Sequence, residues 1–137
     1  MKLYDQCLLF FLHNSKKMDI TFLPRTILSD INILMCLNHA LSIWKTKCEE
    51  RELIRRNLEE WQYTEECMIV YCEFTCGDCR ECEYWEEIQD HIIMYERKMQ
   101  DIDMKIGNLE SVVNEARSNI PPHLSSISTY IEYQFNY

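Results

Sequence analysis

The sequence has very little glycine and proline, with two and three residues respectively in a chain of 137. Turns between strands depend on glycine, proline, asparagine and aspartate. A chain so poor in the first two is unsuited to a sheet with many connections, and a glycine-rich phosphate-binding loop is close to excluded. The sequence therefore predicts a mainly α-helical protein with few and short connections.

The sequence also lacks an excess of basic residues. Asp and Glu outnumber Lys and Arg by 23 to 14, which gives a formal net charge of −9. Nucleic-acid-binding proteins usually present a basic face to the phosphates, so direct binding to nucleic acid is not expected. The one basic group is interleaved with glutamates, which favours a solvated helix face with ion pairs; it consists of Lys45, Lys47, Arg51, Arg55 and Arg56.

No nucleophile elbow, phosphate loop or zinc-protease motif occurs, and no enzyme is expected.

The sequence also has no long apolar run. The apolar residues from Cys7 to Leu12 loosely resemble a signal peptide, but this run is shorter than the usual ~7–15 residues and no cleavage site follows. We interpret residues 1–17 as a short buried or partner-binding segment. No other window approaches a membrane span, so an intracellular protein of nucleus or cytoplasm is expected, without a membrane partner.

The first half of the chain carries a helical pattern. Apolar residues recur at three- and four-residue steps from Ile31 to Trp44 and, with a break allowed, onward to Trp61. Ser29 or Asp30 is the expected N-cap. The segment before it, residues 19–24, is expected to be extended, because the residue before a proline avoids the helical region.

The predicted organisation has five parts. An apolar segment (1–17) and a helical region (18–65) precede a cysteine-rich segment (66–84), a coiled-coil helix (85–120) and a tail (121–137). Residues 68–71 fit either a short strand or a last helical turn. The tail fits either a strand or a short docked helix, and Pro121 and Pro122 end the helix before it.

The longest regular pattern is a heptad repeat from Trp85 to Ile120. With Trp85 at position a, all eleven a and d positions over five heptads are apolar, which is typical of a coiled coil. In a parallel dimer, Lys98 and Lys105 at g would face acidic residues at the following e positions, Asp103 and Glu110.

This stripe has two possible uses. It could pack on the preceding helix as an antiparallel hairpin, or it could bind a second chain. We favour the second, because Arg51 and Glu65 interrupt the apolar stripe of the preceding helix. The residues expected to bind a partner protein or a second copy, giving an oligomer, are Ile88, Ile92, Tyr95, Met99, Ile102, Ile106, Leu109 and Val113.

Eight cysteines are many for a chain without clear signs of secretion. In reducing compartments, clustered cysteines indicate metal binding before disulfides. Cys76-Gly-Asp-Cys79 has the form of a zinc half-site, since the tight turn lets both thiolates converge on one ion. The candidates for the remaining ligands, which stay open, are Cys67 with Cys72, Cys82 with His91, or Cys36 with His39.

A cysteine cluster followed directly by a long coiled coil resembles the layout of RING-type proteins. The Cys67–Cys82 cluster, the size of the chain, and a composition rich in Ile, Asn, Tyr, Met and Cys resemble the small RING- or U-box-like nucleocapsid-assembly proteins of baculoviruses. This resemblance implies a viral structural protein, present in the virion.

The sequence as a whole favours a non-enzymatic assembly protein in which a zinc-type cysteine cluster braces a coiled-coil helix. Two alternatives stay open: a RING-like ubiquitin-ligase adaptor that binds two zinc ions, and a secreted helical bundle stapled by disulfides.

Overall fold

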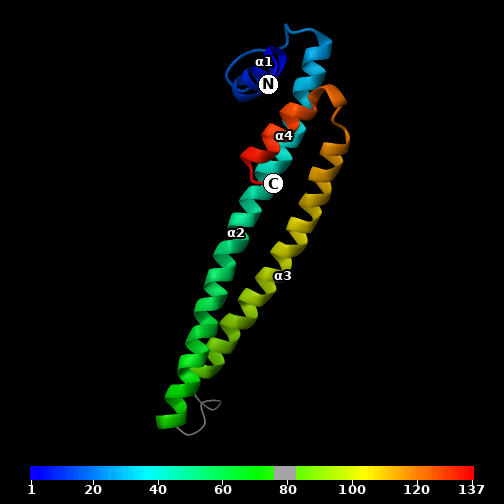
Figure 1. Cartoon of the computed structure of the whole chain (residues 1–137). Coiled ribbons are helices and arrows are strands. Elements are labelled where there is room, and N and C mark those ends of the chain that lie inside the picture. Colours follow the sequence, from blue (N-terminus) through cyan, green and yellow to red (C-terminus); the bar gives the residue numbers. More distant parts are fainter. Residues whose placement is uncertain (76–82) are drawn as a thin grey trace. The chain divides into compact units, whose positions relative to one another are not determined.

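Figure 1 shows the computed structural model of the protein, which describes residues 1–75 and 83–137. These residues form four α-helices and a short 3-10 helix and contain no strand, so the prediction of a mainly α-helical protein is confirmed. The elements are α1 (Leu3–Asn14), α2 (Arg25–Thr75), α3 (Glu83–Ser118), η2 (Pro122–Leu124) and α4 (Ser125–Gln134). The chain divides into two compact units, residues 1–46 with 107–137, and residues 47–106.

The start of α2 differs from the prediction. The helix begins at Arg25, several residues before the expected caps Ser29 and Asp30. Pro24 directly precedes it, and the Pro24 carbonyl oxygen accepts a hydrogen bond of 3.0 Å from the backbone N–H of Leu28. Proline suits this place, because its fixed φ matches a helix and its missing N–H would have had no helical partner.

The segment before α2 is a turn, and the expected extended conformation is wrong. The Asp19 side chain accepts hydrogen bonds from the backbone N–H of Thr21 (2.9 Å) and from the Thr21 hydroxyl (2.6 Å). These two bonds lower the pKa of the Asp19 carboxyl. Aspartate side chains commonly stabilise turns by satisfying nearby backbone groups in this way.

The long helices reach into the predicted cysteine-rich segment from both sides. Residues 68–71 are helical, which decides between the strand and the helical turn, and α2 continues to Thr75. The helix α3 spans 36 residues and agrees with the predicted 85–120 within two residues at each end. The tail forms the helix α4, the second of its two predicted alternatives.

The first unit, residues 1–46 and 107–137, has a continuous apolar core. The segment interpreted as buried or partner-binding contains the helix α1, which buries Leu8 (1% exposed) and Leu12. Every element of this unit supplies buried apolar side chains to one cluster, as the spacing of apolar residues along each helix requires. The cluster consists of Leu8, Leu12, Ile31, Leu34, Leu37, Ala40, Leu41, Val113, Leu124, Ile127 and Ile131.

A buried carboxylate joins three elements of this unit. The carboxylate of Asp30 in α2 accepts hydrogen bonds on one oxygen, Oδ2, from the Tyr4 hydroxyl in α1 (2.5 Å) and from Nε2 of His123 in η2 (3.0 Å). Asp30 is 8% exposed. Because a buried carboxylate is costly without such partners, this cluster fixes α1 and η2 onto the start of α2.

The helix α2 is long and apolar enough in one 18-residue window to cross a membrane by length and composition, with a mean hydropathy of 1.3. The expectation that no further window approaches a span is therefore wrong by this criterion. The core helix of a water-soluble unit passes the same test. Leu34, Leu37 and Leu41 of α2 are fully buried within the first unit, and 33% of the 18-residue window is buried.

The second unit, residues 47–106, is a helical hairpin of α2 and α3. Its cross-helix contacts are an ion pair between Arg51 and Asp103 (2.5 Å), a stack of Trp61 on His91 (3.9 Å between ring centroids), and a hydrogen bond from Gln89 to Glu65. As the residue number rises along α2, the partner's number falls along α3. The two helices are therefore antiparallel, as Figure 1 also shows.

Candidate partner-binding surface

The heptad stripe of α3 is its buried face. All eleven a and d positions from Trp85 to Ile120 are buried or half-buried. Between residues 84 and 120, the only other side chains that are not exposed are those of Gln89 and His91. Among the predicted partner-binding residues, four are at most 7% exposed and four are half-buried. The buried ones are Ile88, Ile92, Ile102 and Val113, and the half-buried ones are Tyr95, Met99, Ile106 and Leu109.

In the second unit, the helix that covers this stripe is α2 of the same chain. Arg51 and Glu65, which argued against an internal hairpin, both have partners on α3: Arg51 pairs with Asp103, and Glu65 accepts a hydrogen bond from Gln89. A polar interruption of a stripe is tolerated when the facing helix supplies the opposite charge or a donor. Binding of a second chain to the stripe stays a prediction.

The basic group on α2 forms ion pairs with neighbouring glutamates, as predicted, except at Arg51, which pairs with Asp103 of α3. Arg55 pairs with Glu52 and Glu59, Arg56 pairs with Glu52, and Lys47 pairs with Glu50 (2.7 Å). The hydrogen bond from Arg55 lowers the pKa of Glu52 to about 2. These exposed pairs contribute little to stability. They pair most of the basic side chains of this segment with glutamates of the same helix.

In the single chain, Asp103 and Lys98 have other neighbours than the ones predicted for a parallel dimer. Asp103 pairs with Arg51, while the Lys98 ammonium lies 5.1 Å from the centroid of the Tyr95 ring. The pairing of Lys98 with Asp103 in a parallel dimer stays a prediction. The second predicted pair, Lys105 with Glu110 in a parallel dimer, stays a prediction.

The predicted metal ligands fall mostly outside the described residues. Cys76, Cys79 and Cys82 lie there, and so does the side chain of Cys72. Cys67, Cys36 and His39 are exposed on α2. Within residues 1–75 and 83–137, no three His, Cys, Asp or Glu side chains are grouped so that they could hold a metal ion. His91, a further candidate, stacks on Trp61.

A mixed-charge groove lies on one side of the hairpin between α2 and α3. It has a volume of about 330 Å³, an apolar lining that includes Leu53, Ile54 and Ile102, and a polar rim. The rim consists of Glu50, Asn57, Tyr95, Lys98, Asp101 and Lys105. Because acidic and basic residues balance on this rim, it selects no particular charge in a partner.

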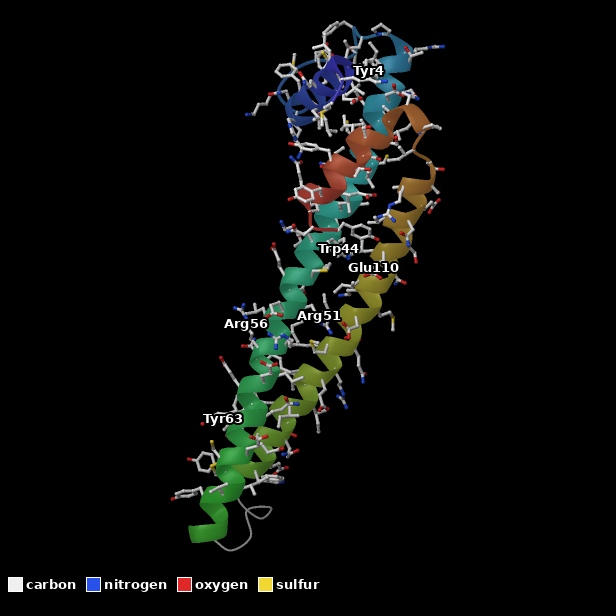
Figure 2. The ribbon with its side chains drawn as sticks, viewed as in Figure 1. Tyr4, Trp44, Arg51, Arg56, Tyr63 and Glu110 are labelled. Atoms are coloured by element: carbon white, nitrogen blue, oxygen red, sulfur yellow. The ribbon has the colours of Figure 1, made fainter. Side chains whose placement is uncertain are left out.

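The outer face of α2 carries a row of exposed side chains, Tyr63, Cys67 and Val70, which we call the outer stripe. Tyr63 is 68% exposed and Val70 is 55% exposed. Figure 2 shows Tyr63 and Arg56 on the side of α2 opposite to Arg51, whose side chain is directed at α3. A hydrogen bond with Cys67 raises the pKa of Tyr63, and the charge of Glu66 adds a smaller contribution in the same direction.

The charge of the chain is concentrated in the hairpin. Residues 47–106 contain 17 acidic and eight basic residues, whereas the rest of the chain contains six of each. The asymmetry is greatest in residues 59–75 and 83–96, which we call the acidic end: they hold ten Asp or Glu and no Lys or Arg. Exposed apolar side chains accompany these charges, among them Ile69, Tyr84, Ile93 and Met94.

The acidic end and the outer stripe were not recognised in the sequence. The signal was available as a count of charges by segment, since the total of −9 conceals a neutral part and a strongly acidic part. The outer stripe was hidden because the helix was expected to end near residue 65. Its i, i+4, i+7 spacing has meaning only once α2 is known to continue to Thr75.

The fold and this surface define an antiparallel helical-hairpin protein with an acidic, partly apolar outer face. Comparison with protein-family models, with curated proteins and with solved structures found no match to the chain.

Proposed function

We propose that this protein is a non-enzymatic structural or assembly protein that binds other proteins through the hairpin of residues 47–106. The observation that supports this function best is the combination of ten acidic residues and exposed apolar side chains at the acidic end. Contiguous exposed apolar residues framed by polar ones are typical of protein-interaction surfaces. The resemblance to baculovirus assembly proteins adds nucleocapsid or virion assembly as the proposed setting.

The hairpin architecture supports this function physically. In a two-helix unit, each helix buries one stripe against the other and keeps its remaining surface in solvent. Hydrophobic residues on that outer surface gain nothing in the free protein, since they stay exposed to water. Their burial by a partner would contribute about 25 cal/mol for each Å² covered.

The proposal is tested by photo-crosslinking in cells that naturally produce the protein. A photoreactive side chain placed at Gln62, which is exposed on α2 next to the outer stripe, should give a discrete crosslink to another protein. The same side chain at Phe22, a 71% exposed aromatic residue of the first unit, should not give that product. If both positions give no protein adduct and the chain elutes as a free monomer from the lysate, the assembly function is wrong.

The zinc cluster remains part of the proposal, with Cys76 and Cys79 as its central pair. Native metal analysis combined with thiol titration should find one zinc ion per chain, and Cys76→Ser with Cys79→Ser should remove it. Two zinc ions would favour the RING-like adaptor instead. The absence of free thiols would favour the disulfide-stapled bundle, and free thiols without metal would leave the cysteines without a ligand role.

A further inference from the structure

The outer stripe has the spacing of a helix-recognition surface. Tyr63, Cys67 and Val70 occupy positions i, i+4 and i+7, so their side chains line one face of α2 over about 10 Å at 1.5 Å per residue. All three are exposed, and the other face of α2 is the one that packs on α3. Apolar anchors at these intervals are the pattern by which one helix packs on another.

A hollow adjoins this stripe at its N-terminal side. It has a volume of about 330 Å³ and is lined by Arg56, Glu59, Glu60 and Tyr63. Arg56 already pairs with Glu52, one turn earlier on α2. Glu59 likewise pairs with Arg55. The hollow therefore offers an aromatic wall and the carboxylate of Glu60 to a side chain that enters from outside the molecule.

The charges around the stripe decide which kind of partner fits. Glu59, Glu60 and Glu66 flank it. Arg55 pairs with Glu59, but the acidic end itself contains no Lys or Arg that would offset Glu60 and Glu66. A second copy would bring its own ten acidic residues to the contact, and like charges brought together within about 8 Å are not screened at physiological salt. A nucleic acid would be repelled for the same reason.

We propose that the outer stripe binds an amphipathic, basic helix of a partner protein. The apolar residues of that helix pack on Tyr63, Cys67 and Val70, and its Lys or Arg residues face the flanking glutamates. The inference rests on the proposed function and specifies the chemistry of the partner. Electrostatic complementarity supplies the selectivity and a fast association rate, while the apolar anchors supply most of the affinity.

The test uses the full-length protein and three labelled synthetic peptides with identical leucine heptads. The remaining positions carry lysine in the first peptide, glutamine in the second and glutamate in the third. Fluorescence anisotropy should show that the lysine peptide binds at least about tenfold more tightly than the glutamine peptide, a factor expected from a few exposed charge pairs. The glutamate peptide should not bind. Raising the salt should weaken binding of the lysine peptide only.

Paired variants locate the binding on the stripe. Tyr63→Ala with Val70→Ala should weaken binding of the lysine peptide by about tenfold, because truncating central anchors removes most of the contact energy. Met104→Ala is the matched control, since Met104 is also exposed (69%) on the hairpin but lies outside the acidic end. Both variants replace exposed residues, so circular dichroism should show unchanged helicity.

Variants that remove charges test whether the glutamates beside the outer stripe are responsible for the preference for a basic peptide. Glu60→Gln with Glu66→Gln should weaken binding by about threefold and reduce its salt dependence. Glu110→Gln with Glu115→Gln changes two glutamates of the first unit that are also exposed, and it should leave binding unchanged. Equal affinity for the lysine and glutamate peptides, or indifference to the stripe variants, would overturn the inference.

The two proposals fail in distinguishable ways. If the photoreactive side chain at Gln62 captures a second copy of the chain or an acidic segment of another protein, the basic-helix inference is wrong while the assembly function stands. If the lysine peptide binds as expected but no protein is captured in cells, the surface chemistry is right and the assembly function is wrong.

Discussion

Replacing Ile102 with aspartate is expected to unfold the hairpin of residues 47–106 and to cost about 3–5 kcal/mol of its stability. Ile102 is 2% exposed at a d position of α3. The substitution removes a buried aliphatic side chain and puts a carboxylate in its place. No buried cation is available at this position, since Arg51 pairs with Asp103.

Thermal unfolding followed by circular dichroism and hydrogen exchange across residues 47–106 measures this effect. Met104→Asp is the control, because it introduces the same charge two residues away at a side chain that is 69% exposed. The control should change stability by no more than about 0.5 kcal/mol. If Ile102→Asp instead left the helices of the single chain intact and altered only the sedimentation coefficient, the stripe would serve a second chain rather than α2.

Replacing Asp30 with alanine is expected to cost the first unit about 2–3 kcal/mol. The change removes the charged acceptor for both the Tyr4 hydroxyl and the His123 ring. Tyr4→Phe should cost less, because it removes only one of the two hydrogen bonds and leaves the Asp30–His123 bond in place. Tyr4 is also 39% exposed, so water can reach this site and replace part of the lost hydrogen bond. Denaturant unfolding of the two variants provides the comparison. Equal stability of Asp30→Ala and the unchanged chain would show that the cluster does not hold α1 in place.

The same cluster predicts a loss of stability in alkaline solution. The hydrogen bond to Asp30, helped by burial and by the charges of Asp30 and Asp5, raises the pKa of Tyr4 from 10.0 to about 12. The folded state therefore holds this proton at pH values where the unfolded state has lost it. The stabilisation is complete below pH 10 and disappears as the pH rises to about 12. Unfolding experiments across this range should show the loss, and Asp30→Ala should abolish it.

Several features of the fold followed from local sequence patterns. The heptad frame that begins at Trp85 identified the buried face of α3 at every a and d position, because apolar periodicity depends only on the geometry of one helix. The same reasoning found the ion-paired face around Arg55. It misplaced the start of α2, where Pro24 and the Asp19 turn outweighed the expected caps at Ser29 and Asp30.

The candidate surface was less accessible to such reasoning. Cys67 was considered only as a metal ligand, and Val70 as part of a strand or a final helical turn. Both became part of the outer stripe once α2 was seen to continue to Thr75 and to bury its opposite face against α3. The central cysteines, Cys76 and Cys79, lie outside the described residues, so their role as zinc ligands stays a prediction.

By itself, the sequence determined the helical class, the length and apolar stripe of α3, and the acidic excess of the chain. These properties depend on composition and on contacts within one or two turns. Only the tertiary structure decided which helix covers that stripe in the single chain. A heptad pattern specifies a surface but not its partner. The contacts that join α2 to α3, such as Arg51 with Asp103, link residues 52 apart in the sequence, so no local pattern contains them.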